Sequence, residues 1–221
     1  MRSVNILEEI SDGKLYDIEE IVKADACGCD GCNDCCIDVG NLVVLTPFDV
    51  HEMVNYLGVG FDELIGNKIE LRENNKILLP YLKMQDSNKH CSFLNQEGRC
   101  TIHSKRPNIC RLFPLGRVYK DDDFKYFLQV GNCPKEELKD VKVSDWIGIE
   151  NYDDNKRLIL EWYKFIKALT FRLKFVRDEK ELEEINEILL DSCYRIKVEE
   201  GNFYSVFFEN LPKIKNRLGI I

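Results

Sequence analysis

The residues of this chain with the clearest chemical potential are four cysteines in one short run, Cys29-x2-Cys32-x2-Cys35-Cys36. Two residues between cysteines let a tight loop turn both sulfurs inward, while backbone N–H groups point at them. Three cysteines at this spacing are what a cubane [4Fe–4S] cluster takes from one loop, with the fourth ligand from elsewhere. Zinc uses a CxxC pair that a second, distant pair completes. The run therefore predicts a metal centre and leaves the metal open.

The doubled cysteine at the end of the run supports a second inference. Neighbouring side chains generally point apart, so Cys35 and Cys36 are not expected to bind one tetrahedral ion without strain. The pair fits two sites that share a loop, or one ligand beside a buried or reactive thiol.

Four further cysteines bring the set to eight. Cys91 and Cys100 flank a predicted small hairpin, which would bring them near each other. Cys133 precedes a proline, as does the cysteine that ends the ferredoxin ligand run. Eight thiols suffice for two four-cysteine sites, but their number alone does not divide them between centres. The predicted metal ligands are Cys29, Cys32, Cys35, Cys36, Cys91, Cys100, Cys110 and Cys133.

Other chemically active residues give weaker signals. Cys27 lies just outside the run, and Cys193 falls in a helical pattern, where a buried structural cysteine is expected. His90 and His103 each lie close to a cysteine and could complete a mixed Cys/His site, although hydrogen-bonded histidines are the simpler interpretation. The arginines around Cys110 would offset thiolate charge, bind an anionic substrate such as a carboxylate, or pair with acidic residues. They are Arg106, Arg111 and Arg117.

Composition indicates a folded cytoplasmic protein. The 221 residues are 44% hydrophobic and 32% charged, with a net charge of −8. The negative net charge argues against non-specific binding to nucleic acid. The N-terminus lacks an apolar core of secretory length, and no stretch approaches the roughly 18–20 apolar residues of a membrane span. Ten cysteines in that compartment indicate metal or redox chemistry more than disulfides. The expected partners are metal ions and a protein partner or substrate, with neither nucleic acid nor membrane.

The pattern around the cysteines predicts an α+β fold of small hairpins and short helices around a cysteine-bound metal centre. Residues 1–25 suggest one or two short helices. Thr46 and Pro47 indicate the start of a helix that should stop at Gly58. Hairpins are expected within residues 68–84, 91–103 and 117–130.

A helical C-terminal extension is expected to follow. Apolar residues recur at helical spacing within residues 158–169 and 182–189, and a last short segment is rich in phenylalanine. Charge and periodicity change near residue 145, which places a soft boundary there. The predicted domains are a cysteine-cluster domain at residues 1–145, with its motif core at 26–134, and a helical extension at 146–221 packed on it.

Several segments resemble a known family in the same order: CDGCNDCC (29–36), LTPFDVHEM (45–53), CSFLNQEGRCTIHSKRPNICRLFP (91–114) and GNCP (131–134). Together they resemble the CxxCxxCC cysteine-cluster family, described as a zinc- or iron-chelating domain. The resemblance implies metal chelation by these cysteines. A domain of this type also occurs in flagellin lysine-N-methylases, where an iron–sulfur cluster and S-adenosylmethionine have been implicated. Members usually have tyrosine where this chain has His103, so no tyrosine role carries over.

The function expected from the sequence is metal binding through one or two iron–sulfur ([4Fe–4S]) or zinc centres. The iron–sulfur cluster is slightly preferred, because the CxxCxxC loop and the distant Cys-Pro fit a cubane. One alternative is an S-adenosylmethionine-dependent enzyme resembling protein lysine N-methyltransferases, for which the sequence offers no catalytic base. Another is an interaction scaffold stabilised by zinc. Four protein ligands per metal favour structure or electron transfer, and an open position favours chemistry.

Overall fold

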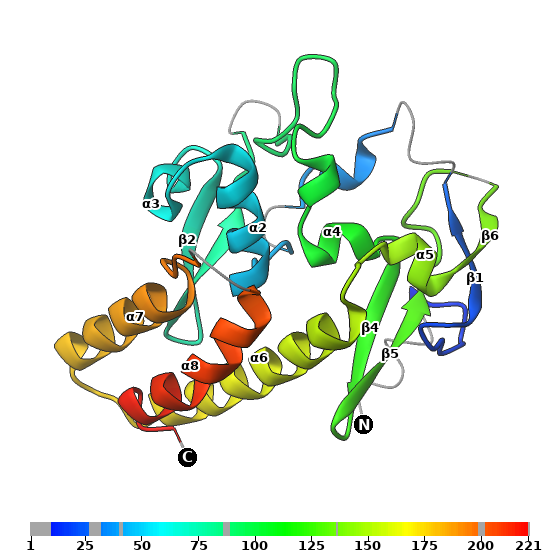
Figure 1. The fold of residues 1–221 in the computed structure, drawn as a ribbon. Coiled ribbons are helices and arrows are strands. Elements are labelled where there is room, and N and C mark those ends of the chain that lie inside the picture. Colours follow the sequence, from blue (N-terminus) through cyan, green and yellow to red (C-terminus); the bar gives the residue numbers. More distant parts are fainter. Residues whose placement is uncertain are drawn as a thin grey trace.

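The computed structural model describes residues 10–26, 32–39, 42–85, 89–135, 137–198 and 202–220. Small antiparallel hairpins and short helices come first along the chain, and three longer helices follow (Figure 1). This arrangement confirms the predicted α+β class. Cys27 and Cys29 lie outside the described residues. None of the helices described in these ranges is long and apolar enough to cross a membrane.

The strands of the described chain pair as three two-stranded antiparallel sheets. The pairs are β1 (Ile21–Asp25) with β6 (Lys139–Lys142), β2 (Ile69–Asn74) with β3 (Ile77–Leu82), and β4 (Leu115–Lys120) with β5 (Asp123–Leu128). The last two pairs confirm the hairpins predicted within 68–84 and 117–130. The hairpin predicted at 91–103 is looser, because it is held by single bridges such as Leu94 with Cys100.

Residues 21–25 form a strand, so the prediction of helices across residues 1–25 is wrong there. Val22 and Ala24 are buried, whereas Ile21 is 65% exposed. This alternation has the two-residue period of a strand. The partner of this strand, β6, lies far along the chain. The local pattern of residues 1–25 therefore could not reveal that pairing.

Short helices are interspersed among the strands, and the last four helices of the described chain follow β6. They are η2 (Asp34–Cys36), α2 (Pro47–Leu57), α3 (Phe61–Leu64), η3 (His103–Lys105), α4 (Asn108–Leu112), α5 (Val143–Ile147), α6 (Tyr152–Leu173), α7 (Glu179–Cys193) and α8 (Phe203–Arg217). The start and end of α2 match the prediction. Thr46 and Asp49 form a capping box, Pro47 takes the first helical position, and Gly58 ends the helix at a φ of 68°.

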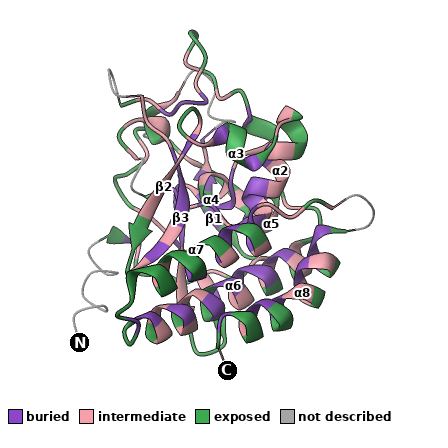
Figure 2. Cartoon of the chain, turned by 90° about the vertical axis from the view of Figure 1, so that its left-hand side faces the viewer, coloured by how far each residue is buried: buried purple, intermediate pink, exposed green. Residues whose placement is uncertain are grey.

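Two hydrophobic clusters hold these elements together. The larger joins α2 and the β2–β3 hairpin to α6, α7 and α8, through buried side chains such as Met53, Ile77 and Phe207. Figure 2 shows the buried residues running along one side of α6 and α8. The smaller cluster joins β1, β4, β5 and α5 to Ile159. Because α6 contributes to both clusters, it connects the two parts of the molecule.

Polar contacts fasten the C-terminal helices to the β2–β3 hairpin. Lys76, at the hairpin tip, donates through Nζ to the carbonyls of Leu173 (3.2 Å) and Val176 (2.8 Å), where α6 ends. A cation is favoured at that position by the helix dipole. In α7, the Asn186 side chain accepts from the Leu78 N–H at 2.7 Å and donates to the Lys76 carbonyl at 3.0 Å. The hairpin and the helices therefore position one another.

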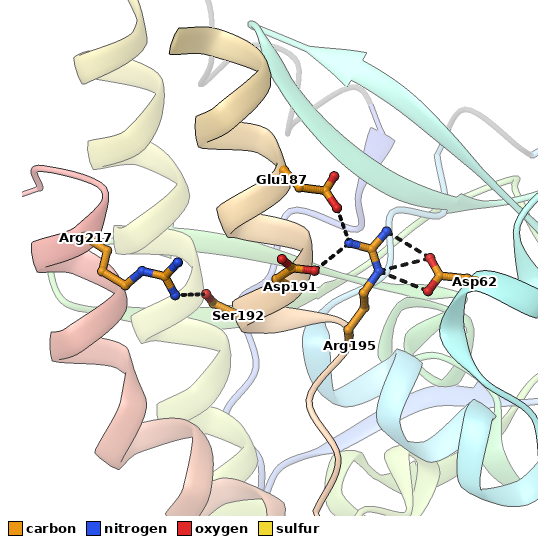
Figure 3. A network of polar contacts seen from close by, with 6 residues as sticks. All are labelled: Asp62, Glu187, Asp191, Ser192, Arg195 and Arg217. Carbon is orange, nitrogen blue, oxygen red and sulfur yellow. Dashed lines mark hydrogen bonds and ion pairs between the residues drawn. The ribbon is translucent and has the colours of Figure 1, made fainter. Parts of the chain in front are cut away.

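A second set of contacts surrounds Arg195, just after α7 (Figure 3). Its guanidinium contacts the carboxylate of Asp62 in α3 at 2.9 Å, and those of Glu187 and Asp191 in α7 at 2.6 and 2.7 Å. The three acidic partners are exposed to solvent, so each pair contributes roughly 0–1 kcal/mol. The network orients the end of α7 against α3, while the hydrophobic clusters supply more of the stability.

Replacing Asn186 by alanine should lower the free energy of unfolding by about 1–3 kcal/mol, because it leaves the Leu78 N–H and the Lys76 carbonyl without their partner. Urea denaturation of the full chain measures the change. The matched control is Asn210→Ala, which removes only an exposed hydrogen bond from Lys213 and should cost less than about 0.5 kcal/mol. Equal costs for the two variants would contradict the structural role given to Asn186.

Candidate metal centre

Six of the predicted cysteine ligands line one cavity of about 320 Å³. They come from three parts of the chain: the end of the cysteine run, the loose hairpin after β3, and the short helix α4. The six are Cys32, Cys35, Cys36, Cys91, Cys100 and Cys110. All six are free thiols. The fold therefore gathers ligand-type side chains that are widely separated in sequence.

Backbone pairing holds the cysteine run against the segment that follows β3. The Cys91 N–H donates to the Cys36 carbonyl at 2.8 Å, and the Asp38 N–H donates to the Lys89 carbonyl at 2.9 Å. Such pairing fixes the register of the two segments. The placement of Cys36 beside Cys91 is thus a property of the backbone and does not depend on the thiols themselves.

The side chains of Cys35 and Cys36 do not point apart, contrary to the prediction. Their Sγ atoms lie 4.0 Å from each other, because both residues sit in the 3-10 turn η2 and not in an extended segment. Two sulfurs on one tetrahedral zinc, each about 2.3 Å from the metal, are about 3.8 Å apart. The observed separation therefore suits two ligands of one centre.

The thiols shift one another's pKa values through hydrogen bonding and electrostatic repulsion. The hydrogen bond from Cys36 lowers the pKa of Cys35 to about 7, and the Arg106 guanidinium lowers it as well, against the opposing effect of burial. The pKa of Cys36 is raised by the same hydrogen bond, by burial and by the neighbouring thiolates. Burial and neighbouring thiolates also raise the pKa of Cys110. Full ionisation of the set requires a compensating positive charge, which a metal supplies.

Asp49 fixes the helix that carries Cys110. Its buried carboxylate accepts, at Oδ1, from the Asn108 backbone N–H (2.8 Å) and side-chain Nδ2 (3.0 Å). At Oδ2 it accepts from the Thr46 backbone N–H (2.8 Å) and hydroxyl (2.7 Å). Burial raises the pKa of Asp49, and the four hydrogen bonds oppose that rise. The sequence indicated the cap of α2 but gave no sign that the same carboxylate holds the start of α4.

Gly98 fits the turn of the loose hairpin against the cysteine run. Its φ is +71°, and a Cβ there would lie 2.6 Å from the Asn33 side-chain nitrogen. The Asn95 side chain holds the turn by accepting from the backbone N–H groups of Glu97 (3.1 Å) and Arg99 (2.7 Å). Both the left-handed backbone and the close approach favour glycine.

The cavity wall also carries two arginines, Arg99 and Arg106, and the imidazole of His103. Burial raises the pKa of Cys100, and the Arg106 guanidinium opposes the rise. The buried Nε of Arg106 has no hydrogen-bond partner within the described chain. His103 lies against Arg106, and burial together with that positive charge lowers the pKa of His103. The histidine therefore favours its neutral form at the cavity wall.

Cys29 is outside the described residues. Cys133, in the loop after β5, is described and does not line the cavity. Its role as a ligand stays a prediction. Cys193 is buried at the end of α7, with 1% exposure, as expected for a structural cysteine. Within the described ranges, no three His, Cys, Asp or Glu side chains are spaced, as they stand, to hold one metal ion.

Residues 28–134 match the model of the CxxCxxCC family, whose description is "Putative zinc- or iron-chelating domain". The matched segment makes up just under half of the 221 residues, and it is similar to that domain. The match runs from the cysteine run to the Gly-Asn-Cys-Pro segment and confirms the resemblance found in the sequence. No curated protein and no solved structure matches the chain.

A residue beyond the segment that the family model matches helps to form the cavity. The ring of Trp146, in α5, belongs to the wall, and its Nε1 donates to the Phe113 carbonyl at 3.2 Å. The sequence did not single out Trp146, because nothing local links it to the cysteines. The cysteine-lined cavity is therefore completed by a residue that follows the matched segment.

Replacing Asp49 by alanine should lower the free energy of unfolding by about 3–5 kcal/mol, because four donors lose their acceptor in a buried place. Asp49→Asn should cost less, since one side-chain oxygen remains. Urea denaturation followed by circular dichroism measures both. Asp62→Ala is the control, because it removes an exposed carboxylate from Arg195 and should cost at most about 1 kcal/mol. A cost for Asp49→Ala as small as that of the control would refute the positioning role.

Replacing Gly98 by alanine should destabilise the fold more than replacing Gly66 by alanine. Both glycines have a positive φ, +71° and +83°, but a Cβ at Gly66 meets no atom within 4 Å. Each substitution pays roughly 1–2 kcal/mol for the left-handed backbone, and only Gly98→Ala adds the clash with Asn33. The difference in unfolding free energy isolates that clash. If the two variants were equally stable, the Asn33 side chain would move aside without measurable cost, contrary to the expectation.

Proposed function

We propose that the protein binds an iron–sulfur cluster through thiols of the 320 Å³ cavity, with Cys29 and Cys133 as further candidate ligands. One observation carries the proposal: six free cysteines from three separate parts of the chain line a single cavity. Thiolates are soft ligands that suit zinc and iron–sulfur clusters. The family implies chelation of the same two metals, zinc or iron.

The size of the cavity and the number of thiols favour a cluster over a single zinc ion. Four sulfurs about 3.8 Å apart enclose one tetrahedral zinc and little else. The cavity of about 320 Å³ is on the order of ten times the volume of one water molecule in the liquid. It therefore has room for a group of several atoms. The CxxCxxC spacing of Cys29, Cys32 and Cys35 suits one face of a cubane.

We infer one centre and not two. Six of the described thiols share one cavity, and the Cys35 and Cys36 sulfurs lie 4.0 Å from each other. A cubane takes four protein ligands, so some thiols of the set would stand beside the centre without binding it. When bound, an iron–sulfur cluster supplies electron transfer or an open iron position, and zinc supplies folding free energy through ligation.

The other functions expected from the sequence stay predictions. They are an S-adenosylmethionine-dependent protein lysine N-methyltransferase-like enzyme and a zinc-stabilised interaction scaffold. A cytoplasmic location stays a prediction as well. No contact among the described residues favours S-adenosylmethionine over other small molecules, so the cysteine-lined cavity supports metal binding first.

Anaerobic purification of the full chain, with elemental analysis and a visible absorption spectrum, tests the metal. We expect a brown protein with iron and acid-labile sulfide in equal amounts, about four of each per chain. Colourless protein with one zinc per chain would overturn the iron–sulfur proposal and leave metal chelation in place. Protein without metal and with bridged thiols would overturn both.

Removing thiols of the cavity wall tests the ligands. The double variant Cys91→Ser with Cys110→Ser should lose at least half of its metal, because it removes two wall thiols from two segments. Cys193→Ala is the control, since that buried side chain lies in α7 outside the cavity wall and should leave metal content unchanged. Circular dichroism checks that each variant is folded. Unchanged metal in the double variant would contradict the expectation and would mean that Cys91 and Cys110 stand beside the centre without binding it.

A further inference from the structure

A second cavity, of about 710 Å³, adjoins the metal cavity. The two share wall residues, among them Cys35, Cys36, Cys110 and Phe113. The volume falls within the roughly 300–1,000 Å³ typical of small-molecule sites. Much of the remaining wall is apolar or aromatic and comes from β4 and α6, with Leu115, Trp162, Tyr163 and Ile166 as examples.

One charged side chain of this wall, Arg117 of β4, has no acidic partner in the described chain. Its guanidinium carbon lies 5.2 Å from the ring centroid of Phe124 and 5.9 Å from that of Tyr126. Its Nε is buried and makes no hydrogen bond to a described residue. None of the ion pairs of the described residues includes it. A hydrogen bond to Tyr119 leaves the positive charge uncompensated.

The acidic residues of the same wall do not supply that compensation. Both oxygens of Asp49 are occupied by the four hydrogen bonds to Thr46 and Asn108. Asp34 is exposed to solvent, where water screens its charge. A half-buried arginine that lies against two aromatic rings, lines a cavity and has no counter-charge is suited to an anionic ligand.

We propose that this cavity binds a small organic carboxylate with an apolar body. The planar guanidinium of Arg117 matches a carboxylate through two parallel hydrogen bonds. The aromatic and aliphatic wall, including Trp162, matches the apolar body. Inorganic phosphate would satisfy the charge and leave that wall without a partner. The carboxylate site goes beyond the proposed metal binding and stands without it, although the shared cysteine wall would hold a bound molecule beside the metal.

Isothermal titration of the full chain with 3-phenylpropionate, its uncharged amide and inorganic phosphate tests the proposal. The carboxylate should bind at least tenfold more tightly than the amide and than phosphate. Arg117→Gln should weaken carboxylate binding at least tenfold and abolish the preference over the amide. The control is Arg157→Gln, which also removes a guanidinium from an aromatic ring, 3.9 Å from the Phe208 centroid, but lies outside this wall. It should bind as the unmodified chain does.

Equal binding of acid and amide, no binding of either, or wild-type affinity in Arg117→Gln would overturn the proposal. Tighter binding of phosphate would replace it with a site for inorganic anions. The comparison of acid with amide uses the unmodified chain, so it holds even if Arg117→Gln does not fold. Metal content, measured on the same samples, separates the two proposals: carboxylate binding by metal-free protein would support this site and reject the metal centre.

Discussion

The buried carboxylate of Asp49 is the contact on which the arrangement of the site depends. It accepts two hydrogen bonds from Thr46, at the start of α2, and two from Asn108, at the start of α4. A buried carboxylate costs on the order of several kcal/mol unless its oxygens are satisfied. If the starts of α2 and α4 separated, the buried carboxylate of Asp49 would lose hydrogen bonds that satisfy its charge. Because α4 carries Cys110, the packing of α2 in the larger hydrophobic cluster also sets the position of a thiol.

The other thiols are positioned by contacts of the same kind. The backbone of Cys36 pairs with that of Cys91, and Gly98 lets the hairpin turn approach Asn33. None of these contacts involves a sulfur atom. The scaffold thus brings together thiols whose simultaneous ionisation is unfavourable without added positive charge. Ligation would relieve that repulsion, and its free energy would add to the stability of the fold.

Local patterns predicted the local structure well. The Thr46-Pro47-Phe48-Asp49 segment indicated the start of α2 through its capping residues, and alternating apolar residues indicated two of the hairpins. The errors had two different causes. The β1 strand depends on a distant partner, β6. The approach of the Cys35 and Cys36 sulfurs depends on the local turn η2, which the sequence did not reveal. The predicted boundary near residue 145 stays a prediction, although residues from both sides share the larger cluster.

The helix α6 has a consequence for cooperativity. Its adjacent residues Leu158 and Ile159 are both buried, but the first belongs to the larger hydrophobic cluster and the second to the smaller. The single helix α6 is thus part of both hydrophobic clusters. Unfolding of one cluster would therefore also remove packing contacts from the other. We expect the chain to lose its structure in one concerted step, so that damage to the cysteine-lined cavity would also destabilise distant helices.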